Sequence, residues 1–97
     1  MSIYLVTPHA IRECTSVQAA IGKALGAERA AQASHGAQAG ADCYVVTGGS
    51  DLSFRGLVVG RKLIGGRGGM GRRLAQFGCA DHVVARVREA IATGTVR

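Results

Sequence analysis

The sequence predicts a small single-domain α/β protein, a two-layer sandwich with the element order β-α-β-β-(α)-α. With 97 residues, the chain has the length of one domain. Short runs of β-branched and aromatic residues alternate with longer segments whose apolar residues recur at helical spacing. Because one helix layer on one sheet face is a simple way to bury such elements, we expect residues 1–97 to form a single unit.

The first part of the chain predicts a strand followed by a long helix. Residues 2–7 are mostly β-branched or aromatic and are closed by a proline, which is typical of a strand ending in a turn. Thr15 or Ser16 can cap a helix over residues 16–33, whose apolar residues form one narrow face. Gly22 and Gly26 within it indicate either close packing on a neighbouring element or a weak helix.

The middle of the chain predicts a β-hairpin. Residues 43–47 read Cys-Tyr-Val-Val-Thr, a short apolar run followed by the turn sequence Gly-Gly-Ser-Asp. A second run lies within residues 52–60, and an antiparallel pair joined by that turn is expected. Leu63 and Ile64 are expected to extend the second strand past a kink.

The last part predicts one short helix and one longer helix. Residues 72–77 are compatible with the short one, and Asp81 is a good N-cap for the longer one. Gly94 is expected to end this longer helix. The apolar residues of the longer helix fall on one face at helical spacing: Val83, Val84, Val87 and Ile91.

Composition argues against several classes of protein. No apolar run approaches the roughly 18 residues that a membrane span requires, and the first residues lack the charged start of a signal peptide. Three cysteines without regular spacing argue against a disulfide framework and suit a reducing compartment. We therefore expect a cytoplasmic protein with no membrane partner.

Positive charge is concentrated in the second half of the sequence. Residues 1–54 carry three Lys or Arg and four Asp or Glu, whereas residues 55–97 carry nine and two. Within residues 55–73 there are six cations, no anion and seven of the 15 glycines. Such a like-charged stretch repels itself and is best tolerated where an anion approaches it.

This Gly/Arg-rich segment, at about residues 55–73, predicts an anion site. Glycines allow backbone N–H groups to converge on an anion, and arginine adds bidentate contacts to phosphate. The leading hypothesis is therefore a non-catalytic module that binds a nucleic acid or nucleoprotein, mostly through phosphate. The residues expected to bind the anion are Arg61, Lys62, Gly65, Gly66, Arg67, Gly68, Arg72 and Arg73.

Two local resemblances fall in the same segment. Ile64-Gly65-Gly66-Arg67-Gly68 is similar to the IGxxG loop of KH domains, which implies contact with a nucleic-acid backbone. Gly65, Gly68 and Gly78 are spaced similarly to the ATP-binding glycines of universal stress proteins, which implies nucleotide binding as a further alternative. This sequence has Cys79 where the latter family has Ser or Thr.

A second class of function is also open. Size and layout resemble those of phage and mobile-element accessory proteins, including some anti-CRISPR inhibitors, which implies binding to an acidic protein surface. A homodimer is expected, because the apolar strands offer more surface than one helix layer covers. No enzyme, cofactor or metal site is expected, since nothing in the sequence completes the isolated group Cys79, Asp81 and His82.

Overall fold

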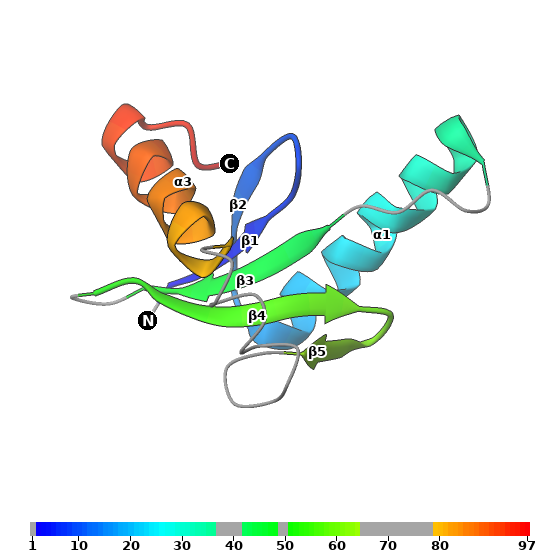
Figure 1. Ribbon diagram of the computed structural model, residues 1–97, viewed down its shortest axis with the longest axis horizontal. Helices are drawn as coiled ribbons and strands as arrows, with labels where there is room; N and C mark the ends of the chain where they lie inside the picture. Colours follow the sequence, from blue (N-terminus) through cyan, green and yellow to red (C-terminus); the bar gives the residue numbers. More distant parts are fainter. Residues whose placement is uncertain (1, 37–41, 49–50, 65–78) are drawn as a thin grey trace.

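A computed structural model describes residues 2–36, 42–48, 51–64 and 79–97, with the side chains of residues 79–80 excepted. These residues form one five-stranded antiparallel sheet and two helices, so the protein is mixed α/β (Figure 1). The sheet order is β2-β1-β3-β4-β5. The strands are β1 (Ile3–Val6), β2 (Ile11–Cys14), β3 (Cys43–Thr47), β4 (Ser53–Val59) and β5 (Lys62–Ile64), and the helices are α1 (Val17–His35) and α3 (Cys79–Thr93).

The two helices cover opposite faces of the sheet. Leu5 belongs to a buried cluster with Ala24 of α1, whereas its neighbour Val6 belongs to a second cluster with Val87 of α3. Since successive side chains along a strand point to opposite faces, the sheet lies between the helices. The expected two-layer sandwich is therefore not confirmed, and the described elements form three layers.

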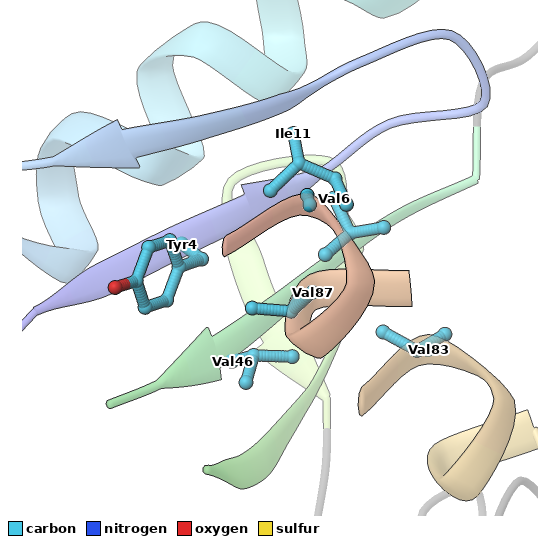
Figure 2. Packing of buried hydrophobic residues seen from close by; sticks show 7 residues of the cluster. Tyr4, Val6, Ile11, Val46, Val83 and Val87 are labelled. Atoms are coloured by element: carbon cyan, nitrogen blue, oxygen red, sulfur yellow. The ribbon is translucent and has the colours of Figure 1, made fainter. Parts of the chain in front are cut away.

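The α3 side holds the larger apolar side chains of the core. Strands β1 and β3 contribute an aromatic ring and two valines, and α3 lays its valines over them (Figure 2). The expected apolar face of the last helix is thus buried through Val83 and Val87, while Ile91 is 47% exposed. The buried residues shown with labels are Tyr4, Val6, Ile11, Val46, Val83 and Val87.

The α1 side is built from smaller groups. Only two residues of α1, Ala20 and Ala24, are fully buried, and both belong to its first half. They lie in one cluster with Leu5 and two free cysteine thiols, Cys14 and Cys43. Because alanine buries little surface, this interface contributes less hydrophobic free energy per residue than the valine-rich α3 side.

The helix ends confirm one expected cap and correct another. Ser16 is the N-cap of α1, where its Oγ accepts a hydrogen bond of 3.1 Å from the Ala19 N–H. Asp81 is not the N-cap of α3, because that helix already begins at Cys79 and Asp81 lies in its first turn. A carboxylate there still interacts favourably with the helix dipole.

Gly94 ends α3 as expected. Its φ of 69° is a left-handed conformation, which glycine adopts without steric cost. Gly94 N–H then donates to the Ile91 carbonyl at 3.3 Å, and Thr95 N–H donates to the Ala90 carbonyl at 2.9 Å. This pair of bonds is the Schellman motif, which satisfies carbonyls left over at the helix end.

The element order differs from the prediction in two strands. β2 was not expected, yet it pairs with β1 along residues 11–14. The expected hairpin of residues 43–47 and 52–60 is confirmed as β3 and β4, with a register shift at Val45/Val46 that leaves Arg55 unpaired in the bulge. β5 reverses direction and pairs with β4 instead of extending it, and the expected helix over residues 72–77 lies outside the described residues.

Candidate anion-binding surfaces

A tight turn between β4 and β5 presents two of the predicted cations. Val59 pairs with Lys62, so Gly60 and Arg61 form a two-residue hairpin loop. Gly60 has a φ of 60°, and no described residue other than glycine has a positive φ. A positive φ at the first loop position only is typical of a type II′ turn, which matches the twist of the flanking strands.

The hairpin tip, residues 60–62, is solvent-exposed. Arg61 and Lys62 are neighbours in the chain, and strands β4 and β5 contain no acidic residue. The structure thus brings two of the eight predicted site residues to one exposed end of the sheet. The other six lie outside the described residues: Gly65, Gly66, Arg67, Gly68, Arg72 and Arg73.

Arg55 lies at the other end of β4 and is partly engaged. Its Nε donates a hydrogen bond of 3.0 Å to Thr47 Oγ1 on the neighbouring strand. Arg55 lies four residues before the end of β4 at Val59, roughly 13 Å at about 3.3 Å per residue, and Arg61 lies beyond that end in the turn. The described cations of β4 and β5 are therefore spread over the length of the sheet edge and do not converge on one point.

A second basic surface lies between α1 and the β1–β2 hairpin. This groove has a volume of about 800 Å³. Three cationic residues line it, Arg12 from β2, Lys23 from α1 and Arg97, together with His9 and His35. Among the described residues that line it there is no Asp or Glu. We call it the basic groove.

The groove exists because the second half of α1 carries almost no side chains on its inner face. Gly26, Ala27, Ala30, Ala31 and Ser34 line it at helical spacing. None of them reaches beyond Cβ or a hydroxyl, and α1 has no fully buried residue after Ala24. The helix therefore runs past the sheet without filling the space beside the β1–β2 hairpin.

A second cavity, of about 610 Å³, lies between the end of α3 and the β1–β2 turn. Arg86, which lines this cavity, already makes a hydrogen bond within the protein. Its Nη2 donates to the Thr7 carbonyl at 3.0 Å and so links α3 to the end of β1. Glu89 lies beside it in the lining. The mixed charge and the engaged arginine make this cavity a weaker candidate for an anion site than the basic groove.

A metal site would require several His, Cys, Asp or Glu side chains to converge. No group of three or more His, Cys, Asp or Glu among the described residues could share a metal ion. Burial raises the pKa of the Cys43 thiol, and the negative charges of Asp42 and Glu28 act in the same direction. A protonated, buried thiol is a poor nucleophile. Asp81 and His82 are exposed on α3.

Sequence reasoning did not find the basic groove. The sequence predicts close packing or a weak helix at Gly22 and Gly26, yet a Cβ at either position would meet nothing within 4 Å. Close packing is therefore wrong, and Gly26 instead leaves the groove open. The available signal was the run of Gly, Ala and Ser at the spacing of one helix face, beside the lone Lys23.

Comparisons with known proteins add no functional information. No protein family, no curated protein and no solved structure matches the chain. Neither α1 nor α3, the helices within the described ranges, combines the length and the hydropathy needed to cross a bilayer. A function has to be argued from the residues and their chemistry.

Proposed function

We propose that the protein is a non-catalytic binding module that engages a phosphate-bearing surface, a nucleic acid or nucleoprotein, through hairpin β4–β5 and the Gly/Arg-rich segment. The observation that carries the proposal is the hairpin tip. There Arg61 and Lys62, neighbours in the chain, are both exposed, and the two strands that the turn joins carry no acidic residue. Cations without local counter-charges favour an approaching polyanion.

Phosphate, more than the bases, is the expected point of contact. Recognition of unpaired bases usually relies on exposed aromatic rings on which the bases stack. In the described part of the chain the aromatic rings are engaged in packing. Tyr4 is buried in the core, and the rings of Tyr44 and Phe54 pack against each other with centroids 6.0 Å apart. Binding is therefore expected to show weak sequence preference.

A gel shift with random-sequence DNA and RNA tests this proposal. At about 50 mM salt we expect a shift with both, and at about 200 mM a large loss of affinity, because counterion release makes phosphate contacts strongly salt-dependent. The matched variants are Lys62→Glu at the hairpin tip and Lys23→Glu in the basic groove. The first should weaken the shift and the second should have a smaller effect. No shift at the lower salt would refute the proposal.

Two further sequence predictions stay predictions. Nucleotide binding by the glycines would involve Gly65, Gly68 and Gly78, which lie outside the described residues. A homodimer is testable by light scattering at micromolar concentration, where a mass near 10 kDa would contradict it. The large apolar side chains that are exposed in the described part of the chain are Val59 and Ile91, on β4 and α3.

A further inference from the structure

We propose that the basic groove is a separate binding site for an acidic peptide segment of a partner protein, in which acidic side chains alternate with small apolar ones. This site is independent of the hairpin tip. It uses the other end of the sheet order, where α1 passes the β1–β2 hairpin. In Figure 1 the β4–β5 hairpin and the β1–β2 hairpin lie on different parts of the molecule.

Charge is the first argument. Arg12, Lys23 and Arg97 are exposed, and no Asp or Glu side chain among the described residues forms an ion pair with any of them. Unpaired like charges that share a groove repel one another, and an anionic occupant relieves this repulsion. The groove therefore complements a ligand that brings several negative charges.

None of the acidic residues among residues 1–97 is left to fill the groove. All of its six acidic residues lie in the described ranges, and none of them lines the groove. The residues outside those ranges, 1, 37–41, 49–50 and 65–78, carry no Asp or Glu, and 65–78 carries three arginines. An anion that occupies the groove would therefore come from outside these 97 residues, and we take a partner protein as its source. The acidic residues are Glu13, Glu28, Asp42, Asp51, Asp81 and Glu89.

The shape and floor of the groove favour a peptide. The α1 residues that line it run from Lys23 to His35, which at 1.5 Å per residue is about 18 Å. An extended chain of five or six residues, at about 3.3 Å per residue, spans that length. The floor is apolar, with Leu5 and a row of alanines, and no Phe, Tyr or Trp ring lines the groove to stack on a base. A peptide fills it with small apolar side chains, which a sugar-phosphate backbone lacks.

The cations lie where such a peptide would place its acidic groups. Lys23 is in the second turn of α1, and Arg12 pairs with Leu5, which packs in the cluster of the same part of the helix. His35 is the last residue of α1, and His9 follows Pro8 in the β1–β2 turn. The basic groove thus has Lys and Arg side chains at one end, small residues in the middle and imidazoles at the other end. This arrangement suits a peptide whose acidic groups are spaced along its length.

The test uses a pool of fluorescein-labelled heptapeptides in which glutamate alternates with alanine, valine or leucine. The matched pool carries glutamine in place of glutamate. We expect the acidic pool to bind the full chain by fluorescence polarisation, and the glutamine pool to bind at least about tenfold more weakly, which corresponds to about 1.4 kcal/mol. Binding of neither pool at about 1 mM protein would overturn the proposal, as would equal binding of both.

Matched variants locate the site. Ala30 lines the groove and Ala33 does not, although both are exposed on α1. Leucine keeps the helix propensity of alanine almost unchanged, so both variants should fold. Ala30→Leu should weaken acidic-pool binding roughly tenfold, and Ala33→Leu should leave it unchanged. Equal effects of the two would overturn the proposed location.

Charge reversal distinguishes this site from the phosphate-binding surface. Lys23→Glu should weaken peptide binding, while Lys62→Glu should not, and the effects on random-sequence DNA should be in the opposite order. Equal loss of peptide binding in both variants would show nonspecific attraction and overturn the site. A groove occupied by a second copy would show as self-association that Lys23→Glu abolishes, which would also overturn it. A failure of DNA binding alone leaves the peptide result unaffected.

Discussion

Arg97 lies beside Arg12 at the edge of the sheet. The Arg97 N–H donates to the carbonyl of Ile11, and the Arg97 carbonyl accepts from the N–H of Glu13, both at 2.9 Å. Arg97 thus makes backbone hydrogen bonds to the residues before and after Arg12, which is the pattern of a parallel strand pair. The pairing protects the edge of β2 and brings two exposed arginines together on one rim of the basic groove.

Val96, next to this pair, is expected to anchor the segment that follows α3. It is half-buried and packs against the cluster on the α3 side. Val96→Thr keeps the side-chain shape but places a hydroxyl in that apolar contact, so we expect the free energy of unfolding to fall by about 1 kcal/mol. Urea unfolding measures this. Val59→Thr is the control, because Val59 is 45% exposed and should tolerate the change. Equal losses would contradict the packing of Val96.

Two glycines predict opposite effects of the same substitution. An alanine Cβ at Gly48 would lie 2.9 Å from Cε2 of Tyr4, a buried ring, so Gly48→Ala should destabilise by roughly 1–3 kcal/mol. At Gly22 a Cβ meets nothing within 4 Å, and Gly22→Ala should stabilise α1 by roughly 0.5–1 kcal/mol. Thermal unfolding of both variants measures the signs. A stabilising Gly48→Ala would show that Tyr4 is not held against that turn.

The raised pKa of Cys43 predicts a loss of stability at high pH. Because burial, helped by Asp42 and Glu28, raises the pKa of the folded thiol above its ordinary value of 9.0, folding favours the protonated form. The corresponding stability is fully present below pH 9 and is lost as the pH rises through the folded pKa. Urea unfolding at about pH 8 and pH 10.5 should show this loss in the wild type. In Cys43→Ala it should be smaller, and an equal loss would contradict the account.

Several elements could be predicted from local patterns. Strand β3 matches residues 43–47, α1 begins directly after the capping residue Ser16, and α3 ends before Gly94. Each of these signals is local, a run of β-branched residues, a hydroxyl before an apolar stripe or a glycine that takes a positive φ. These signals can be detected without knowledge of contacts between residues that are distant in the sequence.

Other features depended on contacts that the sequence does not display. β2 reads Ile-Arg-Glu-Cys, with two charged residues in the middle, and its pairing partners lie in β1 and at Arg97. The apolar run of β3 correctly indicated that both sheet faces are buried. The same run is also the basis of the predicted homodimer, whereas α3 covers the second face. That argument for a homodimer therefore no longer holds, and the homodimer stays a prediction.

The candidate site could be predicted only in part for a similar reason. Arg61 and Lys62 were found because charge and glycine cluster in the sequence itself. The basic groove is assembled from α1, the β1–β2 hairpin and Arg97, which are distant in sequence. Its lining is a set of alanines and single cations, and only the packing of α1 beside the hairpin brings them together.

The salt dependence of DNA binding in one double variant tests the central proposal most directly. We propose measuring the affinity for a random-sequence duplex by fluorescence anisotropy between about 50 and 200 mM salt, for the wild type and for Arg61→Ala/Lys62→Ala. If each side chain contacts one phosphate, the slope of log K against log salt should become shallower by about 1.8, at about 0.9 per phosphate. An unchanged slope, or a wild type that does not bind at about 50 mM salt, would contradict a phosphate-binding hairpin tip.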